Sequence, residues 1–260
     1  MPTNQTVLVT GASGFIAIHC IIQLLEQGYQ VRGTLRSMNR ENELRNTLAK
    51  FVQADDRLNF VQADLLEDAG WADAVRGCDY ILHVASPFPF EAPKDEDDLI
   101  RPAKEGTLRV LRAAADNDVK RVVVTSSIAA ISVGHPREKT HFDEKDWSLP
   151  DSLTIESYPK SKTLAESAAW EFMKNLPQGH PLELAVIKPG YVLGPLPDAH
   201  QRTSGELIQQ LMSGKLPGLA RIQFTGVDVR DVATAHITAM TMPEAAGKRF
   251  PCVNQQFWIL

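Results

Sequence analysis

The sequence predicts an α/β fold, in which a doubly wound parallel sheet of about seven strands is covered by helices on both faces. Short β-branched apolar segments alternate along the chain with longer helical ones, a pattern typical of βαβ units. Two of the segments, Tyr80–Ala85 and Arg121–Ser127, are apolar almost throughout, as expected for parallel strands buried on both faces. With 260 residues, 43% of them hydrophobic, the chain can bury a full core as one compact domain with a small second lobe.

The first strand, Thr6–Thr10, runs into a glycine-rich turn with the spacing G-x-x-G-x-x-A. Gly11 permits a tight turn, Gly14 lets the backbone approach a phosphate, and Ala17 lets the next helix pack closely on the sheet. Gly28 ends that helix, whose first amides and positive dipole end would face a pyrophosphate. Although an ordinary glycine turn would share some of these features, the order strand, turn and helix favours a Rossmann-type dinucleotide site.

The second strand, Gln30–Leu35, favours NADP(H) over NAD(H). An NAD site usually has an acid here for the ribose 2′-hydroxyl, but no acid occurs between Gly28 and Arg40. Arginines suit a 2′-phosphate, so we expect Arg36 to be the main contact with Arg32 beside it. The alternative is that both arginines are solvated surface residues.

The third strand, Leu58–Gln62, follows a helical segment at Glu41–Val52 and ends at Asp64 and Leu65. Asp64 could accept a hydrogen bond from an adenine amino group, or it could cap the next helix, and the sequence does not choose between these.

The fourth strand, Tyr80–Ala85, carries His83 in its middle, where a core histidine with satisfied hydrogen bonds is expected rather than a ligand. Phe88 and Phe90 follow its carboxyl end, where open α/β sheets bind ligands. They could be pocket walls or ordinary packing residues. The acidic cluster Lys94–Asp98 then predicts a helix start.

The fifth strand ends in Thr125-Ser126-Ser127, and a Tyr-x-x-x-Lys pattern opens the helix Tyr158–Asn175. Four residues apart, Tyr158 and Lys162 share one helix face. An ammonium near a phenol would favour the phenolate and bring its pKa toward neutrality, so that the pair could give a proton to a carbonyl oxygen. A strand-end hydroxyl in the same crevice could hold that carbonyl, although it could also be a simple polar cap.

The remaining chain predicts a sixth strand, an irregular break and two further helices. These lie at Glu183–Pro189, Lys188–Pro195, Ser204–Met212 and Val229–Met242, with Arg221–Val227 between the helices.

Composition points to a cytoplasmic protein that binds neither nucleic acid nor membrane. The net charge is -5 and the pI is near 5.8, which does not suit a nucleic-acid partner. Cys20, Cys78 and Cys252 share no metal-ligand spacing, and the histidines show none either, so no metal is expected. No signal peptide or membrane-spanning segment is recognised.

With these motifs in this order, the chain resembles the extended short-chain dehydrogenase/reductases, and within them the dihydroflavonol-reductase-like group, which includes NADPH-dependent aldehyde, methylglyoxal and carbonyl reductases. The matching stretches are Val9–Ala17, Val31–Arg36, His83–Pro87, Arg121–Ser127, Tyr158–Lys162, Lys188–Pro195 and Val227–Ala233.

The resemblance implies catalytic roles for Ser127 as a hydroxyl that binds the carbonyl, Tyr158 as proton donor and Lys162 as the group that lowers the pKa of Tyr158 and holds the nicotinamide ribose. It implies further cofactor contacts: Gly11, Phe15 and Ile16 at the pyrophosphate, Arg36 at the 2′-phosphate, Asp64 and Leu65 at the adenine, Ala85 and Ser86 at the nicotinamide ribose, and Pro189 and Val192 at the nicotinamide ring.

Members of this group usually continue beyond the point that matches Phe250, so the C-terminal substrate lobe is expected to be incomplete. We expect an NADP-binding domain over residues 1–190, to which 228–252 return, and a partial substrate lobe over 191–227 and 253–260. The apolar end Phe257–Leu260 resembles the beginning of a further element.

The expected activity is NADPH-dependent reduction of an aldehyde or ketone, with hydride from nicotinamide C4 and a proton from Tyr158. Two alternatives are an NAD-dependent nucleotide-sugar epimerase or dehydratase, and a truncated NADP-binding pseudoenzyme. Candidate pocket residues suggest an apolar or aromatic cavity for a small-molecule carbonyl substrate: Phe88, Phe90, Tyr191, Leu216 and Phe224. The chain is expected to be a monomer or a homodimer.

Overall fold

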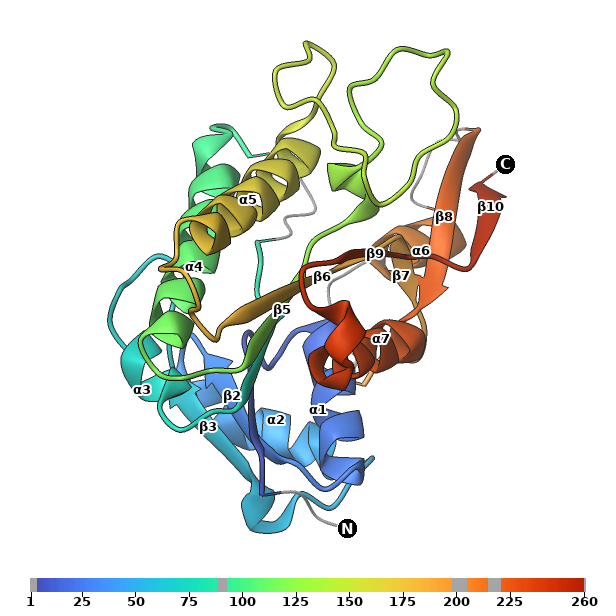
Figure 1. Ribbon diagram of the computed structural model, residues 1–260. Coiled ribbons are helices and arrows are strands. Elements are labelled where there is room, and N and C mark those ends of the chain that lie inside the picture. Colours follow the sequence, from blue (N-terminus) through green and yellow to red (C-terminus); the bar gives the residue numbers. More distant parts are fainter. Residues whose placement is uncertain (1–3, 88–92, 198–204, 215–220, 260) are drawn as a thin grey trace.

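A seven-stranded parallel sheet forms the centre of the protein in the computed structural model, which describes residues 4–87, 93–197, 205–214 and 221–259 (Figure 1). The strand order is β3-β2-β1-β4-β5-β6-β9, and every neighbouring pair is parallel. The order changes direction between β1 and β4, where doubly wound sheets open a ligand crevice. The strands are β1 (Thr6–Val9), β2 (Gln30–Leu35), β3 (Leu58–Gln62), β4 (Tyr80–His83), β5 (Arg121–Thr125), β6 (Glu183–Pro189) and β9 (Arg249–Cys252).

Helices cover both faces of this sheet (Figure 1). The strand side chains alternate: Val7 and Val9 join one apolar cluster, whereas Leu8 joins the other. The first cluster is closed by α1 (Phe15–Glu26), α2 (Glu41–Leu48) and α7 (Val229–Thr241), and the second by α3 (Trp71–Val75), α4 (Asp97–Ala115) and α5 (Ser157–Lys174). The doubly wound fold predicted from sequence is confirmed. Short 3₁₀ helices lie at Met38–Arg40, Asp55–Arg57, Ile128–Ala130 and Pro243–Ala245.

A second, three-stranded sheet follows the carboxyl end of β6. It has the order β10-β8-β7, formed by β7 (Tyr191–Leu193), β8 (Ile222–Asp228) and β10 (Gln255–Ile259), with α6 at Gly205–Met212. Gly190 lets β6 lead directly into β7, because a Cβ on this residue would lie 2.1 Å from the Thr225 carbonyl oxygen. The small sheet is thereby held against the end of the main sheet.

The strands near the C-terminus differ from what the sequence indicates. Neither β7 nor β9 is recognisable locally, and Gln255–Ile259 forms β10, antiparallel to β8. β9 contains Pro251, which is tolerated because β9 is an edge strand. These short strands are set by their pairing partners rather than by a hydrophobic period of their own. The predicted strands Tyr80–Ala85 and Arg121–Ser127 each end two residues early, so that their last residues lie in the crevice.

Candidate active site

Ser127, Tyr158 and Lys162 come together at the carboxyl end of β5. Ser127 directly follows the strand, accepts a hydrogen bond from the Ala129 N–H at 3.1 Å and is hydrogen-bonded to Tyr158. Lys162, one turn further along α5, donates to the Thr125 carbonyl oxygen at 3.3 Å, and its Nζ lies 5.9 Å from the centre of the Tyr158 ring. A hydroxyl, a phenol and an amine are therefore grouped on one strand end and the helix that covers it.

The pKa values of Tyr158 and Lys162 correct one expectation. Burial raises the pKa of Tyr158 to about 12, and the hydrogen bond with Ser127 opposes that rise. Burial lowers the pKa of Lys162 to about 8, while the Glu166 carboxylate acts in the opposite direction. In the chain by itself the phenol is thus a neutral proton donor, because desolvation outweighs the hydrogen bond with Ser127 and the expected lowering of its pKa by Lys162 does not accompany it.

The other two residues of Thr125-Ser126-Ser127 are also held by side chains. The Thr125 hydroxyl lies 2.7 Å from His236 Nε2 on α7, and the Ser126 hydroxyl donates to Glu166 Oε2 on α5 at 2.5 Å. Glu166 was not expected from the sequence to contact this strand end. The available signal was Lys188, which follows four apolar residues in its strand, so that it requires a buried anion and finds it in Glu166.

The glycine turn has the shape that a phosphate cradle needs. Gly11 adopts φ +65, and a Cβ there would lie 3.0 Å from the Ala85 Cβ. Gly14 is the N-cap of α1 and offers no side-chain cap, so the first amides of the helix at Phe15 and Ile16 are left for a ligand. The residues present fit an anionic group at this point.

A pair of arginines borders this turn. Arg36 is exposed immediately after β2, and Arg40 lies one turn later, where its Nη1 donates to the Ser13 hydroxyl in the glycine turn at 3.4 Å. Arg40 was not proposed as a cofactor contact from sequence, although its separation of four residues from Arg36 across a helical turn could have suggested it. Arginine side chains suit a 2′-phosphate, and this contact remains a prediction for Arg36.

Arg32 does not join them, which corrects the expectation from sequence. It lies in mid-strand, opposite Leu8. Its guanidinium donates to the carbonyl oxygens of Ala74 at 2.9 Å and Arg76 at 2.7 Å, at the end of α3. Four residues of extended chain separate Arg32 from Arg36, which is about 13 Å along the strand. Arg32 therefore stabilises a helix end far from the crevice.

Asp64 and Leu65 lie just beyond the carboxyl end of β3. The Asp64 carboxylate accepts from the Leu66 N–H at 3.0 Å in a local turn, and α3 begins only at Trp71, so Asp64 does not cap that helix. Leu65 packs against Gly106 of α4, where a Cβ would lie 2.7 Å from its side chain. The adenine contact remains a prediction for both residues.

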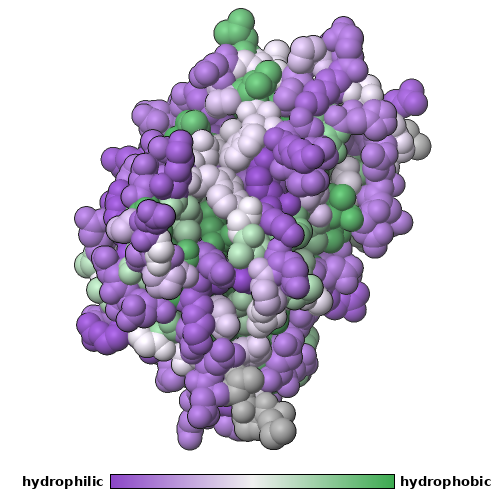
Figure 2. Space-filling view, in the orientation of Figure 1, coloured by the Kyte–Doolittle hydropathy of each residue, from purple (hydrophilic) through white to green (hydrophobic). Residues whose placement is uncertain are grey.

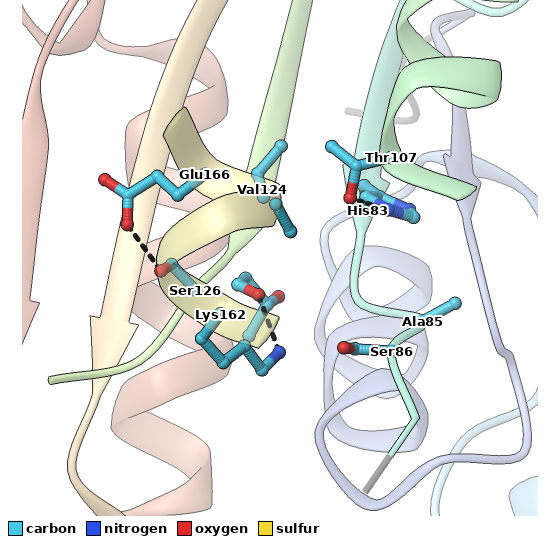
Figure 3. A pocket seen from close by; sticks show the side chains of 10 residues that line it. His83, Ala85, Ser86, Thr107, Val124, Ser126, Lys162 and Glu166 are labelled. Atoms are coloured by element: carbon cyan, nitrogen blue, oxygen red, sulfur yellow. Dashed lines mark hydrogen bonds between the residues drawn. The ribbon is translucent and has the colours of Figure 1, made fainter. Parts of the chain in front are cut away.

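A small cavity of about 10 Å³ separates the ends of β4 and β5 (Figure 3). Ala85, Ser86 and His83 line one side, and Lys162, Ser126 and Glu166 lie on the other. Ala85 and Ser86 thus lie opposite Lys162 across this cavity, and the ribose contact remains a prediction for both.

His83 is the satisfied core histidine that its position predicted. Because Thr107 donates to the Ala103 carbonyl oxygen at 2.8 Å, its hydroxyl oxygen accepts from His83 Nε2 at 3.2 Å. Thr10 accepts from the Ala85 N–H and so donates to His83 Nδ1 at 2.9 Å. Both ring nitrogens are used by the neutral form, and burial lowers the pKa of His83 to about 3.

The small sheet supplies the remaining candidates. Val192 is buried against Phe15 in an apolar cluster, and Pro189 ends β6. Tyr191 and Phe224, the predicted pocket residues, lie with ring centres 4.8 Å apart, and Phe257 of β10 completes the aromatic cluster. Three other pocket candidates, Phe88, Phe90 and Leu216, lie outside the described residues.

Figure 2 shows weakly polar and apolar residues gathered along the middle of the face drawn, between hydrophilic margins. In the described part of the chain, no helix is long and apolar enough to cross a membrane. Within the same residues, no group of three or more His, Cys, Asp and Glu side chains could hold a metal ion.

Comparisons with known proteins show the family and the fold to which this chain belongs. Residues 7–252 match the NAD dependent epimerase/dehydratase family. Cinnamoyl-CoA reductase 1 of Petunia hybrida is 40% identical over 97% of this chain and 73% of its own length, and dihydroflavonol 4-reductase of Zea mays is 35% identical over 98% and 71%. The crystal structure of yeast methylglyoxal/isovaleraldehyde reductase Gre2 complexed with NADPH superposes with a TM-score of 0.87 at 30% identity, covering 98% of this chain and 79% of that one. The resemblance inferred from the motifs is confirmed, and the chain belongs to the NAD dependent epimerase/dehydratase family, among the extended short-chain dehydrogenase/reductases.

Proposed function

We propose that this protein is an NADPH-dependent reductase that converts an aldehyde or a ketone to an alcohol. The observation that carries the proposal is the grouping of Ser127, Tyr158 and Lys162 at one strand end beside the cradle at Gly11. Relatives whose names describe reduction of methylglyoxal, isovaleraldehyde, a dihydroflavonol or a cinnamoyl-CoA support the same reaction class.

The chain offers a binding site for each part of NADPH. The first amides of α1 and the turn at Gly11 and Gly14 would hold the pyrophosphate, and Arg36 with Arg40 would bind the 2′-phosphate. The adenine would lie at the end of β3 by Asp64 and Leu65, and the nicotinamide half would lie near Ala85, Ser86, Pro189 and Val192.

The reaction requires a proton for the carbonyl oxygen once the carbon has been reduced. The nicotinamide supplies a hydride to the carbonyl carbon when the cofactor is bound. Tyr158 is a neutral phenol at physiological pH and gives its proton to the oxygen, while Ser127 holds that oxygen beside it. The Lys162 ammonium, with its pKa of about 8, stabilises the phenolate that remains.

Tyr158→Phe tests the mechanism. We expect kcat for aldehyde reduction to fall about 1,000-fold, because the general acid is lost while the cofactor site is intact. NADPH consumption against a panel of aldehydes, diketones and aryl ketones gives the rate, and fluorescence titration gives the Kd of NADPH.

Tyr80→Phe is the matched control, since it removes a phenol from the opposite end of the sheet, and it should retain the parent rate. A Tyr158→Phe protein that reduces the carbonyl at the parent rate would refute the mechanism. Purification with tightly bound, oxidised NAD would instead favour an epimerase or dehydratase, and tight NADPH binding without turnover would favour a pseudoenzyme.

Compartment and oligomeric state belong to the same proposal. The three cysteines are free thiols, in keeping with a reducing cytoplasm. Ala165 and Ala169 of α5 are buried inside the chain, which favours a monomer over a dimer paired through this alanine-rich face.

A further inference from the structure

Glu166 is a fully buried carboxylate with four hydrogen-bond or ion-pair partners. Its Oε2 accepts from the Ser126 hydroxyl at 2.5 Å and pairs with Lys188, which is also fully buried. Its Oε1 accepts from Arg249 Nε at 2.6 Å and from the Trp170 indole at 3.3 Å. A buried carboxylate is stable only when its lone pairs are used in this way.

This cluster gathers elements that are far apart in the chain. Lys188 comes from β6 and Arg249 from β9. The Arg249 guanidinium also lies 3.7 Å from the Trp147 ring centre and donates to the Glu144 and Asp146 carbonyl oxygens. An ion cluster with a purely architectural role would be complete with these contacts. The hydrogen bond from Ser126 goes beyond such a role, because Ser126 directly precedes the candidate catalytic residue Ser127.

Beside the Ser127–Tyr158 hydrogen bond, two further side-chain links join the end of β5 to α5 in the described residues, and the Ser126–Glu166 bond is one of them (Figure 3). The other runs from Lys162, one helical turn before Glu166, to the Thr125 carbonyl oxygen. Ser127 is the next residue on the strand, and Tyr158 lies on the same helix. Both links are therefore adjacent to the hydrogen-bonded pair of Ser127 and Tyr158.

Glu166 also interacts electrostatically with Lys162, because its negative charge acts to raise the pKa of the Lys162 amine. Both side chains line the small cavity between β4 and β5, together with Ser126. The other titratable or charged groups around Lys162 are Tyr158 on its own helix, His83 on β4, and Lys188 and Arg249 beyond Glu166. Glu166 is the anion of this set, since His83 is neutral and Tyr158 is a phenol at physiological pH.

We propose that Glu166 is a positioning residue for the carbonyl-reducing site: its carboxylate, held by Lys188 and Arg249, fixes Ser126 and thereby the contact between Ser127 and Tyr158, and it supplies the negative charge next to Lys162. The inference rests on the proposed function, and it concerns residues that do not touch the substrate themselves.

Two substitutions test the positioning role. Ser126→Ala removes the link to β5 and leaves the ion pairs in place, and Glu166→Gln removes the charge. For both we expect kcat to fall about 10- to 100-fold at an unchanged NADPH Kd, since a small misplacement of reacting groups has this effect. Ser126→Thr, which keeps the hydroxyl, should restore the rate.

Glu183→Gln is the matched control, because Glu183 pairs with the buried Arg121 at the opposite end of β5. It should lower the midpoint of thermal unfolding without changing kcat. A folded Glu166→Gln or Ser126→Ala protein with the kcat of the parent would overturn the positioning role. A variant whose activity falls only in proportion to its folded fraction would overturn it as well.

The charge of Lys162 gives a readout that does not need turnover. NMR titration of lysine labelled with ¹³C at Cε, assigned with Lys162→Arg, should show the Lys162 amine losing its proton at lower pH in Glu166→Gln than in the parent. The alkaline limb of the kcat profile should move in the same direction. An unchanged Lys162 titration would overturn the proposed electrostatic effect of Glu166 on Lys162. A parent chain that reduces no carbonyl would refute the proposed function, and the titration would still decide whether Glu166 acts on Lys162.

Discussion

At the scale of single residues, position along a strand decides what an arginine does. Arg32 lies within β2 and Arg36 directly after it, and either could bind a 2′-phosphate by its chemistry alone. Arg32 is held at the end of α3 by backbone carbonyl groups, whereas Arg36 directly follows the carboxyl end of β2 and is exposed, and Arg40 donates to Ser13 in the glycine turn. Arg40 is therefore linked to the glycine turn, and Arg36 stays the predicted contact of the 2′-phosphate.

Arg36→Glu should reverse part of the cofactor preference. The carboxylate repels a 2′-phosphate and can accept from a 2′-hydroxyl, so we expect the NADPH/NADH ratio of kcat/KM to fall about 10- to 100-fold, the loss of one or two charge-assisted hydrogen bonds. Steady-state kinetics with both cofactors measures the ratio. Arg32→Gln is the control: it should lower stability through the end of α3 and leave the ratio as it is, and an unchanged ratio in Arg36→Glu would remove Arg36 from the site.

At the scale of elements, the β1–turn–α1 unit depends on two close approaches of backbone. Gly11 combines a left-handed backbone conformation with a Cβ position that Ala85 of the neighbouring chain segment almost occupies. The crevice is narrow at this point because β1 and β4 are hydrogen-bonded neighbours. A side chain at residue 11 would press on the segment that is predicted to contact the nicotinamide ribose.

Gly11→Ala should weaken both folding and cofactor binding. The positive φ costs about 1 kcal/mol of unfolding free energy for an alanine, and the contact with Ala85 adds to this. Gly77→Ala is matched in backbone conformation, with φ +72, but nothing lies within 4 Å of its Cβ.

Urea denaturation and NADPH titration separate the two effects. Both variants should lose about 1 kcal/mol of unfolding free energy from the conformation alone. The NADPH Kd should rise in Gly11→Ala only. A Gly11→Ala protein that binds NADPH as tightly as Gly77→Ala does would show that the turn is no cradle.

At the scale of the whole molecule, the core encloses two neutral histidines next to the site. His83 joins Thr10 to Thr107, and His236 donates from Nδ1 to the Val232 carbonyl oxygen at 2.7 Å and contacts the Thr125 hydroxyl. Burial lowers the pKa of His83 to about 3 and that of His236 to about 4, from 6.5 in the unfolded chain. Because the folded pKa values are depressed, the unfolded state takes up protons first as the pH falls below 6.5.

The protein should therefore lose stability on the acid side of neutrality. The contribution of each neutral histidine to the unfolding free energy is fully present above pH 6.5 and declines as the pH falls toward the folded pKa. At pH 5 the loss of unfolding free energy is about 2 kcal/mol per histidine. Urea denaturation at pH 7 and pH 5 measures this loss. In His236→Gln it should be smaller by about that amount, and an equal loss in parent and variant would mean that His236 is protonated in the folded state.

Much of the fold and of the site could be predicted because its signals are local. The strand at Thr6–Val9, the glycine turn and the helix after it follow one another within 21 residues, and Tyr158 and Lys162 are one helical turn apart. The catalytic roles of Ser127, Tyr158 and Lys162 stay predictions, which the substitutions described above test. The strands β9 and β10 could not be predicted in this way, since their pairing with β6 and β8 defines them.

The sequence by itself determined the doubly wound sheet, the dinucleotide turn, the family and the order of the candidate catalytic residues, because these depend on spacings within one element or between consecutive ones. Only the tertiary structure decided that Arg32 belongs to a helix end, that Arg40 borders the glycine turn, and that Glu166 joins Ser126, Lys188 and Arg249. Those contacts connect residues 40, 22 and 83 positions apart from Glu166. Burial and charge pairing act through space, so a charged residue on a helix takes its role from the strands that pack against it and not from its neighbours in the chain.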